Sequence, residues 1–270
     1  MPSSPKTLPC ALAIGGLDPG GGAGIAADLR AMTAAGAFGC AAVAALTVQS
    51  TAGLRRVRAV PARELTSQVA EVMRHQRVLS VKVGALGGRA NVCAIAKLLA
   101  QHADVPVVVD TPISPTRGHA RLLERGAVEA LKDALLPRAT LVTVNIDEVQ
   151  ALLGERVRSV GEARDAALAL AALGPRAALV KGGHLTGDSA IDVLAVEGDV
   201  IELRARRLAI PRTHGSGCTF ASLIAGRLAV RGGRFDRDTL VAAIRWAKRV
   251  HHAALARTVD VGRGLRVIVF

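Results

Sequence analysis

The 270-residue sequence predicts an α/β protein, a three-layer α/β/α sandwich with a mainly parallel central sheet and an antiparallel hairpin at one edge. Short apolar runs alternate with longer segments of helical spacing, which is typical of strands buried on both faces by helices. Half of the residues are hydrophobic and 21% are charged, enough apolar surface to exclude general disorder. Because no repeat, linker or composition shift interrupts the chain, we expect residues 1–270 to form a single domain.

Six apolar runs are expected to form the parallel strands. Several are rich in Val, and most end in Gly, Asp, Asn or Lys. Such near-continuous runs indicate strands covered on both faces. They span residues 10–15, 39–49, 80–83, 106–110, 141–144 and 177–181.

The segments between these runs carry the spacing of amphipathic helices. They span residues 23–36, 61–75, 89–102, 120–136 and 160–173. Pro61 suits a first helical turn, and Gly36 and Gly174 suit the ends of helices.

After the sixth run the pattern changes. Residues 190–196 and 201–210 predict two strands around the turn Glu197-Gly198-Asp199, hence an antiparallel hairpin. Two helices are then expected near residues 216–231 and 237–258. The helical pair His251-His252 lacks acidic partners nearby in sequence, and we interpret it as surface.

The net charge of +13 raises the question of a nucleic-acid partner. Only six of the 35 basic residues are Lys, and the adjacent Arg pairs are limited to Arg55-Arg56 and Arg206-Arg207. Aromatic residues make up 2% of the chain, too few for a base-stacking platform. We therefore expect a solvated Arg-rich surface and no nucleic-acid partner.

The cysteines and the N-terminal residues favour a cytoplasmic protein. The four Cys residues show no C-x-x-C spacing, so zinc and redox motifs are not predicted. Residues 1–6 do not resemble a cleaved secretory signal. The uncharged stretch 31–54 contains Gly, Thr and Gln residues, so we expect a helix end and a buried strand there, and no membrane contact.

A glycine-rich segment, Gly-Gly-Leu-Asp-Pro-Gly-Gly-Gly-Ala-Gly at residues 15–24, follows the first strand and opens a helix. Ligands of open parallel sheets bind beyond the carboxyl ends of the strands. Dense glycine lets the backbone approach a ligand, and a helix N-terminus favours an anion. The segment is not a Walker A loop and fits G-x-G-x-x-G only loosely, so an ordinary strand–helix turn is the alternative.

A second glycine-rich segment, Thr-His-Gly-Ser-Gly-Cys-Thr at residues 213–219, also opens a helix. The amides of Gly215, Ser216 and Gly217 can face a phosphate. Cys218 falls in the first helical turn, where the positive helix end is expected to lower a thiol pKa. The alternative is a structural Cys after a glycine turn.

Two further motifs follow later strands. Asn145 and Glu148 share one face of a helical turn and could support Mg²⁺, although the residues alone favour a simple helix cap. Lys181 precedes Gly182, Gly183 and His184. Its ammonium group could bind a phosphate. The alternative is a surface Lys beside a turn. Together the four motifs predict a phosphoryl-transfer site.

The order and spacing of these motifs resemble the ribokinase-like superfamily, and more closely the hydroxymethylpyrimidine/phosphomethylpyrimidine kinases of thiamine biosynthesis. The resemblance runs from about residue 11 to about residue 254. It is carried by the segments 18–29, 45–49, 81–84, 136–137, 143–145, 180–184 and 213–219. It implies a ribokinase-like fold and an ATP-dependent kinase that phosphorylates the hydroxymethyl group of 4-amino-5-hydroxymethyl-2-methylpyrimidine and its monophosphate.

The resemblance also implies roles at the transfer site. Cys218 matches the family's catalytic base, where most ribokinase relatives carry Asp, and Gly215, Ser216 and Gly217 match its anion hole. His214 matches a loop histidine with a positional role. ATP, Mg²⁺ and a homodimer are implied as well.

Other positions match nucleotide and metal contacts of the family. Asn145, Lys181 and Thr213 correspond to ATP-binding positions, and Glu148 and Asp110 correspond to positions that support the metal. Asp28 matches another acidic position near the transferred phosphate.

The acceptor side is where the sequence departs from the family. The positions implied to bind the pyrimidine are Gly16, Asp18, Ala23, Gln49, Ala85 and Pro112. A Met is expected at Ala85, a Ser at Leu17, and Pro-Val-Met where Thr111-Pro112-Ile113 stand. Val144 replaces a Pro, which is a milder change. These departures suggest a remodelled pocket, with a weak second phosphorylation or another small aromatic alcohol as acceptor.

Three alternatives stay open at this point. The first is a pyridoxal- or pyridoxine-type kinase, which uses the same cysteine loop in this branch. The second is a divergent paralogue with another acceptor. The third, a non-catalytic ligand-binding protein, is disfavoured because Cys218 and both glycine loops are present.

Overall fold

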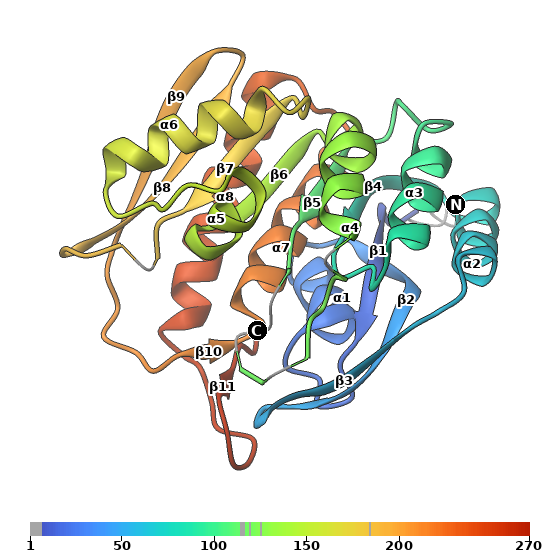
Figure 1. The fold of residues 1–270 in the computed structure, drawn as a ribbon, viewed down its shortest axis with the longest axis horizontal. Coiled ribbons are helices and arrows are strands. Elements are labelled where there is room, and N and C mark those ends of the chain that lie inside the picture. The colour runs from blue at the N-terminus through green and yellow to red at the C-terminus, as the bar shows by residue number, and fades with distance from the viewer. Residues whose placement is uncertain (1–6, 114–116, 119, 125, 184) are drawn as a thin grey trace, which may run out of the picture.

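The computed structural model describes residues 7–113, 117–118, 120–124, 126–183 and 185–270. Its centre is a nine-stranded sheet with the order β3-β2-β1-β4-β5-β6-β7-β8-β9 (Figure 1). The strands are β1 (Cys10–Leu17), β2 (Phe38–Ser50), β3 (Gly53–Ala59), β4 (Val78–Val83), β5 (Val107–Asp110), β6 (Leu141–Asn145), β7 (Ala177–Lys181), β8 (Ser189–Val196) and β9 (Asp199–Arg206).

The six strands from β2 to β7 in the sheet order are parallel, and β3, β8 and β9 are antiparallel to their neighbours. All six predicted parallel strands are confirmed, with ends shifted by a few residues at most. The predicted hairpin is also confirmed, although its second strand ends at Arg206 and not at residue 210. All four residues of β5 are buried, which explains its continuous apolar sequence.

Helices cover both faces of the sheet, so the predicted three-layer sandwich is confirmed (Figure 1). One layer contains α1 (Gly24–Ala34), α7 (Ser216–Val230) and α8 (Arg237–Leu255). The other contains α2 (Ala62–His75), α3 (Arg89–Leu99), α4 (Ala127–Ala130), α5 (Ile146–Leu153) and α6 (Val160–Ala171). Among the described residues, no helix combines the length and the apolar character that crossing a membrane requires.

The helix predicted for residues 120–136 is wrong in its first part. Helical structure begins only at Ala127 and continues as a π-helical turn, Leu131–Leu135, and a 3-10 turn, Leu136–Arg138. Leu123 instead forms a parallel bridge with Gly87, and the Glu124 N–H donates to the Gly87 carbonyl. This tertiary pairing overrides the local helical spacing.

Three strands lie outside the predicted set. The edge strand β3 carries exposed arginines, so its apolar alternation is too weak to recognise in the sequence. The short strands β10 (Thr213–His214) and β11 (Arg266–Val267) pair with each other. This pair ties the second glycine-rich segment to the C-terminal residues.

Candidate active site

Most of the predicted site residues meet at one edge of the sheet. Asp18 follows β1, while Asp110, Asn145 and Lys181 are the last residues of β5, β6 and β7. Because these strands are parallel neighbours, their carboxyl ends lie side by side. The sheet therefore gathers residues that are far apart in the sequence.

Asp18 organises the first glycine-rich segment. Its carboxylate accepts hydrogen bonds from the Gly20 N–H at 2.8 Å and the Ala23 N–H at 2.9 Å, and His214 Nε2 lies 2.8 Å from its Oδ2. Burial opposes ionisation, but His214 and the two N–H groups outweigh it and lower the pKa of Asp18. Because Asp18 is ionised, His214 donates this hydrogen bond from Nε2. The Asp18–His214 pair joins the two glycine-rich segments, since each contributes one of its residues.

The two segments also touch through their backbones. Gly215 has a φ of 74°, and a Cβ on it would overlap the Gly22 carbonyl oxygen. A Cβ on Gly22 would in turn overlap the His214 ring. The glycines at these positions are therefore required by close approach and, at Gly215, by the positive φ.

Cys218 lies in the first turn of α7, whose N-cap is Gly215. The prediction of a low thiol pKa for Cys218 is wrong. Burial raises the pKa of the Cys218 thiol to about 12; the charges of Asp110 and Asp28 act in the same direction, and Lys82 and the Gly24 N–H oppose them. Desolvation outweighs the helix N-terminus here.

Lys181 joins the acidic residues of the site. Its Nζ donates to Asp110 Oδ1 at 3.0 Å and lies 3.9 Å from Glu148 Oε2. Burial would lower the pKa of Lys181, but Asp110 and Glu148 hold it above its usual value. A Cβ on Gly217 would lie 3.2 Å from Lys181 Nζ and 3.8 Å from Asp110 Oδ1, so the second glycine-rich segment lies directly over this ion pair.

The carboxyl groups of Asp110 and Glu148 differ in their pKa values. Burial opposes ionisation of Asp110, but Lys181 and Lys82 lower its pKa, and Thr143 donates to Asp110 Oδ1 at 3.1 Å. Burial and the charge of Asp110 raise the pKa of Glu148 to about 7, against the opposing effect of Lys181. Asp110 is therefore the more acidic of these two carboxyl groups.

Asn145 and Glu148 form a capping box at the start of α5, the arrangement that the sequence alone favoured. Asn145 Oδ1 accepts from the Glu148 N–H at 2.8 Å, and Glu148 Oε2 accepts from the Asn145 N–H at 2.7 Å. Asn145 Nδ2 takes no part in this capping box. In the described part of the chain, no three His, Cys, Asp or Glu side chains form a ready-made metal site.

The turn after β7 is held by residues that sequence reasoning missed. Asp192 Oδ1 accepts from the Gly182 N–H at 3.0 Å, and Lys248 Nζ lies 2.7 Å from Asp192 Oδ2. Lys248 thereby links α8 to the Lys181 turn. His184, which belongs to the predicted motif, lies outside the described residues.

The prediction that His251 is a surface residue is wrong. Its ring stacks on Phe220 of α7 with centroids 5.2 Å apart, and its Nε2 lies 3.1 Å from Ser216 Oγ. Burial, together with the positive charges of Lys248 and Lys181, lowers the pKa of His251 to about 3. The sequence does not indicate this position of His251, because the packing of α8 on α7 brings its ring to Phe220 and Ser216.

Asp28 lies beneath the site in a fully buried network. Lys82 Nζ donates to both carboxylate oxygens of Asp28 at 3.0 Å, and Ser222 Oγ donates to Asp28 Oδ1 at 2.8 Å. Lys82 and Asp28 are both 0% exposed, so neither is placed to contact a substrate phosphate directly. The network instead joins β4, α1 and α7 under the glycine-rich segments.

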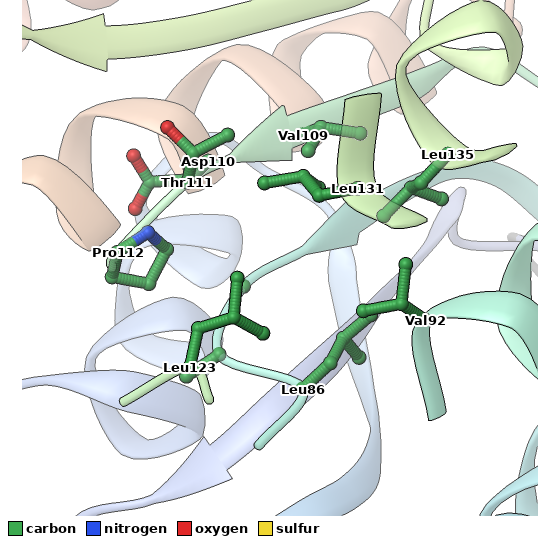
Figure 2. A pocket seen from close by; sticks show the side chains of 11 residues that line it. Leu86, Val92, Val109, Asp110, Thr111, Pro112, Leu123, Leu131 and Leu135 are labelled. Carbon is green, nitrogen blue, oxygen red and sulfur yellow. The ribbon is translucent and has the colours of Figure 1, made fainter. Parts of the chain in front are cut away.

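The residues that depart from the family pattern adjoin other residues predicted for the acceptor side. A Cβ on Gly16 would lie 3.7 Å from the Ala85 Cβ, so these two positions adjoin. Ala85, Thr111 and Pro112 line one pocket together with Asp110 and apolar side chains (Figure 2). Thr111 Oγ1 is buried and has no hydrogen-bond partner among the described residues.

Gln49 and Thr213, two further predicted contacts, lie near the second glycine-rich segment or within it. Gln49 Nε2 lies 3.4 Å from His214 Nε2, which puts the Gln49 amide beside the Asp18–His214 pair. Thr213 Oγ1 donates to the Pro211 carbonyl at 3.3 Å, and Thr213 has no hydrogen bond or ion pair to Lys181 or Asp110 in the described structure. The Thr213 hydroxyl is therefore bonded within its own loop, and its role as an ATP contact stays a prediction.

A sequence profile described as phosphomethylpyrimidine kinase matches residues 18–268. The chain belongs to the phosphomethylpyrimidine kinase family. It is therefore a phosphotransferase. The matched range contains residues 18–24 of the first glycine-rich segment, the whole second segment and Lys181.

Individual relatives agree with this assignment. The chain is 40% identical over 264 residues to the hydroxymethylpyrimidine/phosphomethylpyrimidine kinase of Streptomyces coelicolor, covering 98% of this chain and 95% of that protein. The structure is similar to that of Bacillus subtilis pyridoxal kinase in an ADP complex, with a TM-score of 0.85, 26% identity and 97% coverage of each chain. It is also similar to phosphomethylpyrimidine kinase from Clostridium difficile, with a TM-score of 0.73 and 28% identity, over 89% of this chain and 98% of that one. The ribokinase-like fold expected from the sequence is confirmed by these neighbours.

Proposed function

We propose that this kinase transfers the γ-phosphoryl group of ATP to the hydroxymethyl group of 4-amino-5-hydroxymethyl-2-methylpyrimidine, and acts more weakly on the resulting monophosphate. The supporting observation is the position of the second glycine-rich segment. It touches the Asp18 segment on one side and the Lys181–Asp110 pair on the other. A phosphoryl group bound over Gly217 would lie between an acceptor side and a nucleotide side.

Backbone N–H groups provide most of the proposed binding of the transferred group. The amides of Gly215, Ser216 and Gly217 open α7, where the helix N-terminus favours negative charge. Lys181 neutralises charge on the nucleotide phosphates, and Asn145 Nδ2 adds a further donor. Such fixed positive groups lower the barrier because phosphoryl transfer depends mainly on positioning and electrostatics.

Cys218 is the proposed base. As the acceptor oxygen bonds to phosphorus and the bond to the ADP oxygen breaks, the hydroxyl proton passes to the Cys218 thiolate. Because the pKa of Cys218 is about 12, this side chain is mostly a thiol at neutral pH. The small thiolate fraction is correspondingly a strong base.

Asp110 and Glu148 fit a proposed Mg²⁺ ion that accompanies ATP. Both offer carboxylate oxygen within reach of Lys181, and Mg²⁺ in kinases uses one or two carboxylates together with phosphate oxygens and waters. When bound, Mg²⁺ supplies positive charge that offsets the phosphates. Lys181 holds the two carboxyl groups together when no ion is bound.

The residues on the acceptor side support an altered fit for the pyrimidine ring. Gly16, Asp18, Ala23 and Gln49 are the proposed contacts beside the Asp18–His214 pair. Ala85 and Pro112 line a small gap beside Asp110, and Figure 2 labels Pro112. A smaller side chain at Ala85 and the fixed φ of Pro112 reshape that lining, which is why we expect a weaker second phosphorylation.

The test compares three acceptors with ATP and Mg²⁺: hydroxymethylpyrimidine, its monophosphate and pyridoxal. We expect the highest kcat/KM for hydroxymethylpyrimidine, a lower value for the monophosphate and the lowest for pyridoxal. Pyridoxal as the best acceptor would assign the chain to the pyridoxal-type alternative. Equal turnover of both pyrimidines would overturn the proposed remodelling of the pocket.

Three further features belong to this proposal. Residues 1–270 act as one kinase domain, because one sheet and two helix layers contain nearly all described elements. A homodimer is supported by Leu46 and Val48 of β2, which are 50% and 44% exposed near the sheet edge. A cytoplasmic location is supported by the four cysteines, which are all free.

A further inference from the structure

A hollow on the outer helix layer gathers arginines that are scattered in the sequence. It lies between α7 and α8, away from the sheet edge that carries the active site. Arg227 follows Cys218 by nine residues on α7, which corresponds to about 13 Å along the helix axis. The hollow is lined by Arg227, Arg231, Asp238, Val241, Ala242, Arg245, Trp246 and Arg249.

Helical spacing explains why four guanidinium groups meet here. Arg227 and Arg231 are four residues apart at the end of α7, and Arg245 and Arg249 are four residues apart on α8, so each pair shares a helix face. The Arg227 guanidinium carbon lies 4.9 Å from the centroid of the Trp246 ring. This cation–π contact fixes one of the four charges in the hollow.

The positive charge of the hollow is unmatched. In the described parts of the chain, none of its four arginines forms an ion pair, whereas Arg164 and Arg204 share Glu202. The one carboxylate in the lining, Asp238, lies 3.8 Å from Arg237, outside the hollow. Burial, and then the charges of Arg231 and Arg249, lower the pKa of Arg227.

We propose that this hollow is a second anion site, which binds a compact oligophosphate such as inorganic triphosphate or the phosphate chain of a nucleotide. Guanidinium groups form paired hydrogen bonds with phosphate oxygens, and an anion would remove the repulsion among the arginines. The hollow is open to solvent and has a volume of about 340 Å³, which is in the range of small-molecule sites. Four converging cations match a few adjacent phosphates better than a long strip of nucleic acid.

Trp246 provides a direct test, because it is the only tryptophan in a chain without tyrosine. Inorganic triphosphate is titrated into the full-length protein while Trp246 fluorescence is followed. We expect a saturable change whose Kd rises at least tenfold in the double variant R245Q/R249Q. The matched control R55Q/R56Q removes two exposed charges from β3, and we expect less than a twofold change in Kd. Kinase turnover of R245Q/R249Q should stay within twofold of wild type, which shows that the fold is kept.

Parallel titrations with ATP and with a nucleic-acid duplex distinguish between the possible sources of the phosphates. ATP that binds the hollow more tightly than triphosphate would indicate a nucleotide, and equal Kd values would indicate recognition of the phosphate chain alone; both support the site. An unsaturable change, or equal weakening by the two double variants, would reduce the hollow to diffuse surface charge and overturn the proposal. A 20-base-pair duplex that binds more tightly than triphosphate, with the binding lost in R245Q/R249Q, would overturn it in favour of nucleic acid.

Discussion

His251 of α8 places its Nε2 3.1 Å from Ser216 Oγ, in the first turn of α7. The ring is stacked on Phe220, so a residue near the end of the chain supports the loop proposed to hold the transferred phosphoryl group. With its pKa lowered to about 3, the imidazole stays neutral above that pH. His251 is therefore a positioning residue for the anion loop.

Replacement of His251 by Leu should raise the KM for ATP by about two- to tenfold, the equivalent of one net hydrogen bond. Steady-state kinetics between pH 5 and 8 should show the same ratio throughout, because the neutral imidazole does not titrate there. His251→Gln should restore part of the loss by retaining a polar group toward Ser216. The neighbouring variant His252→Leu is the control, and an equal effect from it would contradict the assignment to His251.

The pH dependence of kcat/KM tests the form in which Cys218 acts. The thiolate is the required form, and its raised pKa places the deprotonated fraction far below one at neutral pH. We therefore expect kcat/KM to rise with pH from 7 to 10 without a plateau. A plateau just above pH 7 would point to Glu148, whose pKa is about 7, as the controlling group.

The buried pair of Lys82 and Asp28 should be essential for stability. Burial already raises the pKa of Asp28, and Lys82→Met leaves this buried carboxyl group with only the hydrogen bond from Ser222. Loss of the buried ion-pair partner is expected to cost about 3–5 kcal/mol of unfolding free energy. Urea denaturation measures the loss, with the exposed Lys97→Met on α3 as the matched control. A loss for Lys82→Met no larger than for Lys97→Met would show that the pair contributes nothing net.

Replacement by Val should change the free energy of unfolding differently at Thr111 and at Thr143. Thr111 Oγ1 is buried without a partner in the described structure, so Thr111→Val should leave the unfolding free energy unchanged or raise it by about 1 kcal/mol. Thr143 donates to Asp110, so Thr143→Val should lower it by about 1–2 kcal/mol. Equal destabilisation by both variants in thermal or urea unfolding would mean that Thr111 has a partner.

Sequence patterns predicted the sheet and both glycine-rich segments because those features are local. A buried parallel strand such as β5 is apolar at every position, and a close backbone approach at Gly215 leaves a glycine in the sequence. The edge strand β3 and the late start of α4 were missed, since exposed arginines and the bridge between Gly87 and Leu123 have no local signature.

The parts of the site that escaped prediction depend on tertiary contacts. His251, Lys82 and Lys248 each act on a residue more than 30 positions away in the chain. The direction of the Cys218 pKa was wrong because burial depth is not visible in a sequence. Scattered arginines likewise gave no sign of the hollow between α7 and α8.

The central claim is that the phosphoryl group of ATP passes to the pyrimidine hydroxymethyl group beside Cys218. The most direct test measures formation of ADP and of the phosphorylated pyrimidine by the wild-type enzyme and by Cys218→Ala, with thermal unfolding as the check on folding. We predict equal amounts of the two products from the wild type, and a rate about 10²–10⁴ lower for Cys218→Ala at an unchanged Tm. No phosphorylated pyrimidine from the wild type, or an undiminished rate from Cys218→Ala, would contradict the claim.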